Sequence, residues 1–574
     1  MPRALRHLGA GLALLAGVWV AGADGAFLRP GAAIATAILV VLMAGLRGLA
    51  GGLTLDAPRQ WLGGLVTWAA LAAVALPVAR SEAAYLVAVG AVAWLLAGVV
   101  SGWRDRAWAC GVVAGLGATA GLFLMAGRWA EGVRSDGLLG NPNLSATVAL
   151  LGLASAPFAR LPVAGRLALG TLSLGGIVAS GSRAAMLGAA AMTVAWLLAG
   201  TTSRRLKQGA LLALLVAALG LTARVATDHD PLRFERVRIW SVAAAVARES
   251  LPWGTGPGGY ADVATAHNFP QDGRVARYGL LPTLAESDLL QLLASLGLPG
   301  VLLGGGLLWS LLRRLPRAGA HAAGCVAAVA ATSAFHTQLA APVVAWTATL
   351  AVAAALPGTR RWPLRDSPSA TVSVGPVLAA LLAIALVQPD WWLGGRPEPP
   401  LAQARALAAQ TPPTDIRLAN AEALAVRATT LRPRWNEAWS TLGAIEARRA
   451  SLRGEPALTL GAQEAFRQAR ACNPLDAFAA LEEGRAAKVR RDVPAARAAL
   501  QAATGLEPNL VSAWVELASL ALEEGRLAAA RRNLDQALRA RRLRVERPTG
   551  YERALLSFDP AAIARLQAAL GERR

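Results

Sequence analysis

Long apolar stretches recur along the first 389 of the 574 residues, and they constrain the fold more than any other feature of the chain. Each is about 17 to 22 residues long with almost no charge, the length that an α-helix needs to cross ~30 Å of hydrocarbon. The stretches, about thirteen in all, cover residues 8–23, 30–46, 61–79, 83–101, 107–126, 143–159, 165–181, 184–200, 208–223, 288–312, 318–336, 340–357 and 371–388. We therefore expect an all-α, polytopic membrane domain over residues 1–389. The first stretch could instead be a cleaved signal peptide, since arginines precede it and Ala-Gly-Ala follows it.

Basic residues in alternate loops predict the orientation of these helices, because Lys and Arg are retained on the cytoplasmic side during insertion. The loops concerned carry Arg47, Arg59, Arg104, Arg106, Arg160, Arg166, Arg204, Arg205, Lys207, Arg313, Arg314, Arg317, Arg360, Arg361 and Arg365. This pattern places the N-terminus in the cytoplasm. The opposite, periplasmic side then holds residues 127–142, the turn at 182–183, the long loop 224–287 and everything after about residue 389. A bacterial inner membrane suits such a protein.

The formal net charge of +21 does not indicate nucleic-acid binding. Much of the excess is the loop arginine just described, and the rest is spread over the C-terminal region instead of forming a basic stripe. The three cysteines, Cys110, Cys325 and Cys472, are far apart in sequence and predict neither a disulfide framework nor a metal site. No metal or cofactor is expected.

A change of composition to Ala, Arg, Glu and Leu after residue 389 predicts a soluble helical domain. Residues 390–427 are interpreted as a linker and a leading helix, 428–545 as repeats and 546–574 as a capping helix. The repeats resemble tetratricopeptide repeats, with Pro474 and Pro508 one repeat length apart and an insertion expected near 451–460. Asp559 and Pro560 predict the N-cap and first position of the capping helix. Such a domain would bind a protein partner.

Within the membrane domain, the segment GLLGNPNLSA opens a predicted span on the outer side. Its Asn-Pro-Asn has a simple structural reading, with Asn143 as N-cap and Pro142 ending the preceding segment. A functional reading is also open, because a helix N-terminus flanked by the amides of Asn141 and Asn143 could hold an anion or a sugar hydroxyl.

Arginines on the outer side are the second polar feature. Arg183 lies in the turn between two spans, where a charge is costly and usually has a partner or ligand. The long loop 224–287 carries Arg236, Arg238 and Trp240, and a helix would place Arg236 and Trp240 on one face because they are four residues apart. The loop also contains a glycine pattern over 254–258 that mimics a dinucleotide fingerprint, but with no preceding strand it means little.

Taken in order, these fragments resemble the O-antigen ligase and polymerase family of membrane glycosyltransferases, which share a Wzy-type C-terminal domain. The resemblance covers residues 130–350. It rests on the Asn-Pro-Asn segment, Arg183, Arg236 with Trp240, the 252–258 segment and the Leu-rich segment 285–300. It implies transfer of a glycan from an undecaprenyl-diphosphate carrier to an acceptor on the periplasmic face. That acceptor could be a lipid core, a growing polysaccharide or a protein.

The residue types suit that chemistry. A diphosphate leaving group needs charge neutralisation more than protonation, and the paired donors of arginine match phosphate oxygens. Arg183, Arg236 and Arg238 are therefore the candidate diphosphate ligands, with Asn141, Asn143 and Trp240 as further substrate-binding residues and Arg236 also counted as catalytic. The acceptor hydroxyl in turn needs a general base.

The base is left open by the sequence. Where the family carries a histidine before the Leu-rich span, this chain has Glu286, so either Glu286 is the base or His267 of the loop takes that role. Glu286 is preferred because its place relative to the span is retained. His336, at the outer end of the span 318–336, is another histidine on that side. Three alternatives to a transferase are kept. The chain could bind lipid-linked glycan without transferring it, it could be a transporter or flippase of lipid-linked saccharide, or it could be a non-catalytic scaffold of an assembly complex.

Overall fold

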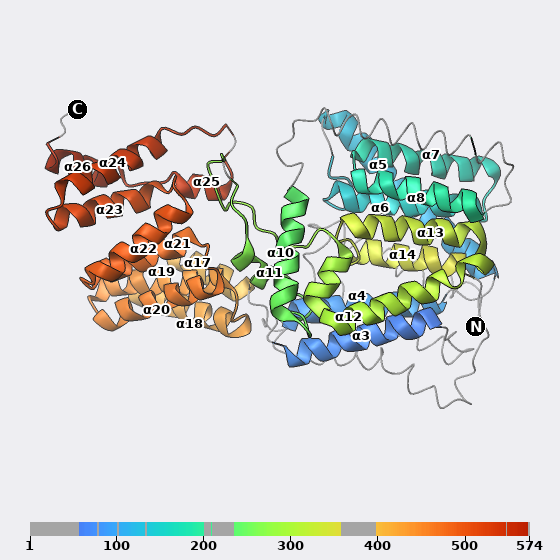
Figure 1. Ribbon diagram of the computed structural model, residues 1–574, viewed down its shortest axis with the longest axis horizontal. Coiled ribbons are helices and arrows are strands. Elements are labelled where there is room, and N and C mark those ends of the chain that lie inside the picture. The colour runs from blue at the N-terminus through green and yellow to red at the C-terminus, as the bar shows by residue number, and fades with distance from the viewer. Residues whose placement is uncertain are drawn as a thin grey trace. The chain divides into compact units, whose positions relative to one another are not determined.

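The computed structural model describes residues 57–76, 80–99, 103–132, 135–199, 208, 235–271, 273–356, 398–546 and 548–571. Within these ranges all regular elements are helices, which confirms the all-α class (Figure 1). The chain divides into two compact units: residues 1–258 with 284–388, here called the membrane unit, and residues 259–283 with 389–574, here called the repeat unit. The predicted spans 8–23, 30–46, 208–223 and 371–388 lie outside the described residues.

The helices of the membrane unit follow the remaining predicted spans closely. They are α3 (Ala57–Ala75), α4 (Arg80–Val99), α5 (Trp103–Glu131), α6 (Pro142–Ser155), α7 (Val163–Ser180), α8 (Arg183–Ala199), α10 (Glu235–Ser250), α12 (Asp288–Leu312), α13 (Leu315–Phe335) and α14 (Pro342–Ala355), with a short 3₁₀ helix η1 (Ala156–Phe158) after α6. Four apolar stretches within α5, α7, α12 and α13 are long enough to cross a membrane, and α8 and α14 are shorter apolar helices. The total of about thirteen spans stays a prediction.

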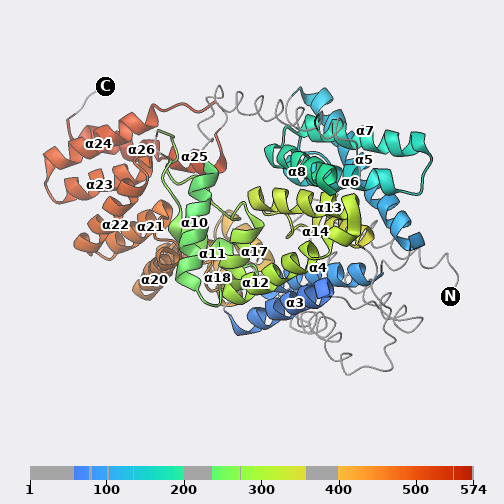
Figure 2. The same ribbon diagram turned by 45° about the vertical axis from the view of Figure 1, so that its right-hand side comes forward.

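Small residues let three of these helices pack closely. A Cβ on Gly117 of α5 would lie 2.4 Å from the Cα of Gly152 in α6, and a Cβ on Gly176 of α7 would lie 2.1 Å from the Cα of Gly121 in α5. Such contacts replace the hydrophobic driving force that lipid does not supply, because close backbones gain van der Waals packing. Figures 1 and 2 both show α5, α6 and α7 as neighbours.

The start of α6 corrects one detail of the sequence interpretation. Asn141, not Asn143, is the N-cap: its Oδ1 accepts hydrogen bonds from the backbone N–H groups of Asn143 and Leu144, at 2.9 and 3.4 Å. Pro142 is the first helical residue, where its missing N–H costs nothing because that group would have no helical partner. The proline therefore begins the helix and does not end the preceding segment.

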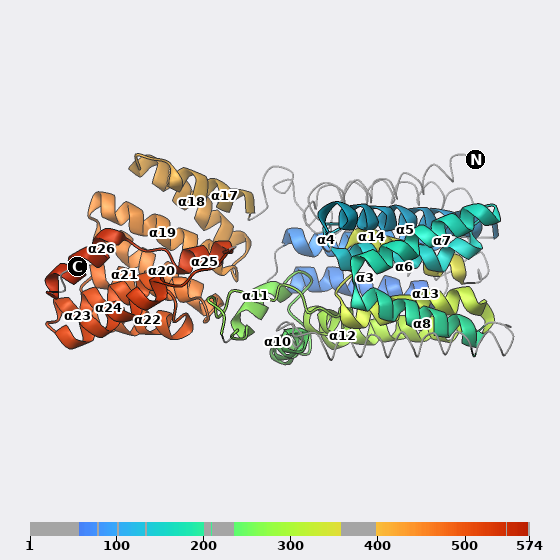
Figure 3. The ribbon, with the colours of Figure 1, turned by 90° about the horizontal axis from the view of Figure 1, so that it is seen from above.

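Helix α10 is the one described helix of the long outer loop that belongs to the membrane unit. It runs crosswise to α8, α12 and α13 in Figure 1 and is seen nearly end-on in Figure 3. It packs on α12 through the buried side chains Val242, Ala243, Val246 and Ala247. Its 16 residues include five with a charged side chain, as suits a helix lying at the membrane surface instead of crossing it.

The repeat unit is a series of helix pairs. Its main helices are α17 (Glu398–Ala409), α18 (Asp415–Leu431), α19 (Asn436–Arg453), α20 (Pro456–Cys472), α21 (Ala477–Val489), α22 (Val493–Leu506), α23 (Val511–Glu523) and α24 (Leu527–Arg541), followed by α25 (Gly550–Leu555) and α26 (Pro560–Ala569). Equivalent bonds recur in it: the indole N–H groups of Trp439 and Trp514 each donate to a proline carbonyl six residues earlier, both at 2.8 Å. The tetratricopeptide identity itself stays a prediction.

Two details of the repeat interpretation can be checked. The insertion near 451–460 does not form the expected loop: α19 continues to Arg453 and α20 begins at Pro456, so the extra residues lengthen two helices. The predicted start of the last helix is confirmed, whereas its capping role stays a prediction. Asp559 accepts a hydrogen bond from the N–H of Ala561, and Pro560 is the first residue of α26.

Part of the long loop folds into the repeat unit. Residues 259–283 include the short helices α11 (Tyr260–Ala264) and η3 (Thr265–His267). The buried carboxylate of Glu507 accepts the backbone N–H groups of Arg277 and Tyr278, at 2.8 and 2.7 Å. The guanidinium of Arg432 pairs with Asp262, and Ala276 lies in the apolar core of the helix pairs. The loop is thus divided, with α10 in the membrane unit and its following segment in the repeat unit.

Candidate functional site

The site begins at the turn between α7 and α8. Gly181 ends α7 in the left-handed conformation at φ 60°, which a residue without a Cβ adopts most readily. The Ser180 hydroxyl accepts the N–H of Ser182, and the Ser182 hydroxyl accepts the N–H of Ala185. These two bonds fix the turn and place Arg183, with its exposed side chain, at the first residue of α8.

Helix α10 supplies Arg236 and Trp240, which both approach Glu286. The Trp240 indole Nε1–H donates to the Glu286 carbonyl at 3.3 Å, and its ring lies 6.1 Å from that of Phe335. Arg236 interacts electrostatically with Glu286 and with Arg183. Arg238 is two residues further, about 200° around the helix, and its side chain is exposed. The structure therefore brings Arg183, Arg236 and Glu286 together and turns Arg238 to another side of α10.

Glu286 is held in an uncommon backbone conformation. Its φ of 51° lies in the left-handed region, where a residue other than glycine is disfavoured by roughly 1–2 kcal/mol. Hydrogen bonds on both sides fix it: the N–H of Ala285 donates to Gln291 Oε1 at 2.9 Å, and the N–H of Ser287 donates to Thr337 Oγ1 at 3.1 Å. Strain that is held this firmly is characteristic of functional positions.

His336 is the direct partner of the Glu286 carboxylate. Its Nδ1 lies 2.6 Å from Glu286 Oε2, and the imidazole is 4% exposed whereas the carboxylate is 26% exposed. His336 Nε2 is buried and has no hydrogen-bond partner among the residues that the structure describes. The carboxylate is therefore the more accessible member of the pair, and the imidazole is the buried one.

The charges around this pair favour an ionised glutamate. Burial alone would raise the pKa of Glu286, but the hydrogen bond to His336 and the electrostatic effects of His336 and Arg236 outweigh it, so the pKa is held below its usual range. Burial lowers the pKa of Arg236; Glu286 opposes that change, and the neighbouring positive charge of Arg183 adds to it. Two cations and one anion share this site, which leaves an excess of positive charge for an anionic ligand.

A polar network joins this site to the Asn-Pro-Asn end of α6. Asp288 Oδ1 accepts the N–H groups of Gln338 and Leu339, at 3.0 and 3.1 Å. The side chain of Gln338 accepts a hydrogen bond from the Thr147 hydroxyl at 2.8 Å, and that hydroxyl also lies 3.0 Å from the Asn143 carbonyl. Asn141 and Asn143 are thus connected to the 336–339 segment through α6. The Oδ1 of Asn141 already serves as the helix cap.

The glycine-rich segment after α10 has a structural role. Helix α12 is interrupted at Gly297, where φ is 64° and ψ is −158°. The segment lies along this break: the N–H groups of Thr255 and Gly256 donate to the carbonyls of Ala294 and Ser295, both at 2.9 Å. A Cβ on Gly297 would lie 2.1 Å from the Pro252 carbonyl oxygen. The glycines therefore permit a close backbone contact, which explains the spacing that mimics a dinucleotide motif.

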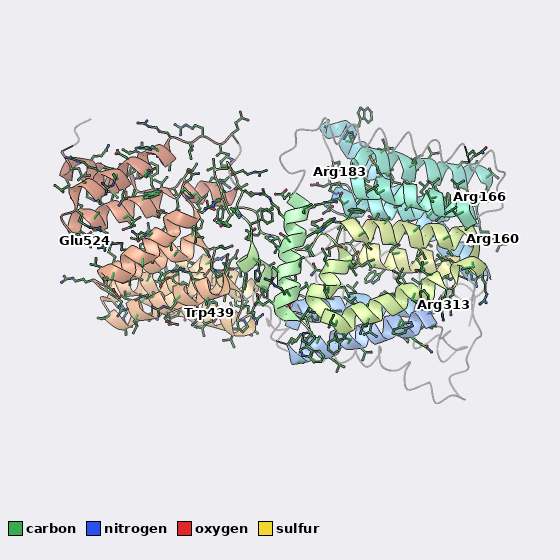
Figure 4. All side chains as sticks on the ribbon, viewed as in Figure 1. Arg160, Arg166, Arg183, Arg313, Trp439 and Glu524 are labelled. Atoms are coloured by element: carbon green, nitrogen blue, oxygen red, sulfur yellow. The ribbon has the colours of Figure 1, made fainter. Side chains whose placement is uncertain are left out.

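His267 ends η3 in the repeat unit, whereas Glu286 belongs to the membrane unit. Figure 4 shows Arg183 at one end of the membrane unit and Arg160, Arg166 and Arg313 toward the other. Sequence reasoning named His336 only as a further outer histidine and did not identify the polar roles of Gln338 and Thr147, because their partners are about fifty or more residues away.

Comparison with known protein families agrees with this picture. Residues 168–304 match the family model described as O-Antigen ligase. The matched segment runs from α7 to α12 and contains Arg183, Arg236 and Glu286. No curated protein matches the chain. The match supports the O-antigen ligase family for this part of the chain, and with it a membrane glycan ligase or polymerase.

Proposed function

We propose that this chain transfers an oligosaccharide from an undecaprenyl-diphosphate carrier to an acceptor hydroxyl at the periplasmic face of a bacterial inner membrane. One observation carries the proposal: Arg183, Arg236 and an ionised Glu286 share one site within the segment that matches the O-antigen ligase family. The acceptor class, whether glycolipid, polysaccharide or protein, is left open. The repeat unit is proposed to bind the acceptor or a protein partner.

Arg236 and Arg183 would bind the diphosphate. Each guanidinium offers several N–H donors to phosphate oxygens, and a ligand with negative charge removes the repulsion between the two cations. As the glycosidic C–O bond to the carrier breaks, negative charge grows on the departing phosphate oxygen. Fixed cations at that point stabilise the transition state more than the ground state, which is what accelerates the reaction.

Glu286 would act as general base. The acceptor oxygen forms a new bond to the anomeric carbon, its proton passes to the Glu286 carboxylate, and the bonding pair to the carrier leaves with the diphosphate. A carboxylate with a lowered pKa is a weak base, but the acceptor hydroxyl becomes strongly acidic as its oxygen bonds to carbon. A weak base is adequate because the diphosphate is a good leaving group.

His336 would position this carboxylate without touching the substrate. Its Nδ1 holds one carboxylate oxygen at 2.6 Å. The second oxygen is then directed by the fixed backbone of residues 285–287. The arrangement resembles other carboxylate–imidazole pairs, in which one group orients and the other exchanges the proton. Here the exposed member is the carboxylate.

The test is a transfer assay with the purified full-length chain in liposomes, using undecaprenyl-diphosphate oligosaccharide and separate candidate acceptors. Glu286→Gln should lower the rate by about 10²–10⁴-fold, the usual contribution of a general base. Arg236→Ala should lower it by about a hundredfold or more. Arg238→Ala is the matched control on the same helix and should change the rate little, because that side chain faces away from Glu286.

His267→Ala separates the two candidate bases. Loss of transfer in His267→Ala with Glu286→Gln still active would assign the base to His267 and overturn the role of Glu286. Transport of the lipid-linked glycan across the bilayer with no transfer to any acceptor would support a flippase instead. Carrier consumption without a glycosylated product would show hydrolysis and contradict a transferase.

A further inference from the structure

A cavity of about 730 Å³ lies within the membrane unit, and the proposed transfer site does not include it. Its walls come from the start of α5, the η1 turn, the start of α7, the start of α13 and the end of α14. Arg160 and Arg166, which line it, lie at the opposite end of this unit from Arg183 (Figure 4). The cavity is therefore a separate feature, on the side that the basic loops predict to be cytoplasmic.

Three arginines from two parts of the chain line this cavity, here called the arginine pocket: Arg106 of α5, and Arg160 and Arg166 beside η1. Arg166 donates one hydrogen bond to the Pro157 carbonyl at 3.0 Å, which fixes its side chain at the pocket wall. The Nε of Arg106 is buried and has no hydrogen-bond partner within the described part of the chain. None of the described side chains that line the pocket is acidic. Three cations gathered there favour an anionic ligand.

A buried histidine adds a second, independent indication of a ligand. His321 is 8% exposed, lines the pocket and stacks on Phe158 with ring centroids 4.0 Å apart. Its Nε2 has no partner among the described residues. A buried polar nitrogen without a partner is costly, and a ligand oxygen would satisfy it. The stacking on Phe158 fixes the plane of the ring.

The backbone of α13 also favours an anionic ligand in the arginine pocket. Helix α13 breaks at Gly319, with φ 78° and ψ −173°, and restarts with Ala320 and His321 at the pocket wall. The first turn of a helix carries N–H groups without helical partners and a partial positive charge, so it favours an anion. This helix start and the three arginines face the same cavity.

Three exposed apolar side chains that are close in sequence to Arg160 and Arg166 are here called the apolar rim. Leu161, Val163 and Leu167 flank the two arginines beside η1 and are 40, 62 and 65% exposed. Side chains of this type on a membrane protein suit contact with acyl chains. A headgroup in the pocket would thus have its tails against an apolar surface, whereas a soluble anion would gain nothing from it.

We propose that the arginine pocket binds the phosphate group of an anionic phospholipid. Arg106, Arg160 and Arg166 contact the phosphate oxygens, His321 Nε2 donates to one of them, and the acyl chains lie over the apolar rim. Basic pockets between membrane helices on the cytoplasmic side are a known type of lipid headgroup site. A bound lipid would hold α5, α7 and α13 together at this end of the membrane unit.

The test uses the full-length chain purified in a neutral detergent and titrated with phosphatidylglycerol that carries a fluorescent acyl chain. Unlabelled phosphatidylglycerol, phosphatidylcholine and inorganic phosphate serve as competitors. Arg160→Gln and Arg166→Gln are each expected to weaken binding by about tenfold, which corresponds to ~1.4 kcal/mol. Arg160→Lys should retain part of the affinity, because it keeps the charge but not the paired donors.

Arg313→Gln is the matched control, because Arg313 lies toward the same end but does not line the pocket; its guanidinium lies 4.9 Å from the Trp309 ring. Competition by phosphatidylglycerol alone, with Arg313→Gln within about twofold of the parent protein, supports the proposal. Inorganic phosphate competing equally well would assign the pocket to a soluble phosphate and overturn the lipid. Equal competition by phosphatidylcholine, or pocket variants no weaker than Arg313→Gln, would overturn the site itself. These variants leave Arg183, Arg236 and Glu286 intact, so the outcome of the lipid-binding test does not depend on the proposed transfer reaction.

Discussion

Removal of one carboxylate should release the loop segment 259–283 from the repeat unit. Arg432 Nε lies 3.1 and 3.0 Å from the two carboxylate oxygens of Asp262, and its second terminal nitrogen lies 2.8 Å from one of them. The side chains are 11 and 9% exposed, so the pair is almost fully buried. Asp262→Ala would leave the Arg432 guanidinium without this partner inside the protein.

The size of the effect follows from that burial. Removing one partner of a buried ion pair costs about 3–5 kcal/mol, because the remaining charge is desolvated without compensation. An opening equilibrium shifts tenfold for each ~1.4 kcal/mol, so the segment should open about 10²- to 4 × 10³-fold more often. The two hydrogen bonds that Glu507 accepts near Arg277 still hold the far end of the segment, so the opening should centre on α11.

Hydrogen–deuterium exchange of the full-length chain measures this opening. Amides of residues 259–271 should lose protection by about two to three and a half orders of magnitude in Asp262→Ala. The control pair is Arg405 and Glu437, whose side chains are 52 and 51% exposed and 3.3 Å apart. Glu437→Ala should cost at most about 1 kcal/mol, because exposed pairs contribute little.

The double variant Asp262→Ala with Arg432→Met removes both charges and should recover part of the protection. Exchange of residues 259–271 within threefold of the parent protein in Asp262→Ala would refute the argument. An equal loss of protection throughout α17 to α24 would also refute it, because the ion pair would then support the whole unit and not this segment.

Three further predictions concern other parts of the chain. Gly297→Ala should abolish or strongly reduce folded protein in detergent, because its Cβ would lie 2.1 Å from a carbonyl oxygen. Gly305→Ala in the same helix should be tolerated, because its Cβ would meet no atom within 4 Å. Thermal unfolding of the two variants compares their stability. Because the pKa of Glu286 is lowered from 4.5, its carboxylate form is lost only as pH falls below that value, so the acid limb of the transfer rate should lie below pH 4.5 and disappear in Glu286→Gln. Burial, and then repulsion from Glu422, raises the pKa of Glu446 from 4.5 to about 7, so ionisation of this carboxyl disfavours the folded repeat unit. The free energy of unfolding of this unit should therefore fall as pH rises from 4.5 to 7. Denaturant titrations at several pH values measure this dependence, which Glu446→Gln should remove.

The sequence predicted the described apolar helices of the membrane unit well because their signal is local. A span such as 288–312 needs only its own apolar residues to be identified, and α12 has those same bounds. The break at Gly297 was not predicted, because it depends on backbone bonds with residues 252–256, which are distant in sequence. The missed N-cap at Asn141 has a local reason instead: Pro142 fits the first helical position, which places the cap two residues earlier than expected.

The partner of Glu286 could not be predicted from the sequence either, because it is distant along the chain. A resemblance to the family raised the question of why a glutamate occupies the position where an imidazole is common. The structure places an imidazole next to that position, since His336 lies 2.6 Å from Glu286 although fifty residues separate them. A carboxylate–imidazole pair can move a proton with either member facing the substrate, provided that the other holds it in place. Under the proposed function, the exchange of residue type at 286 is therefore compatible with a general base at the same point, because Glu286 would take the proton while His336 holds the carboxylate in place.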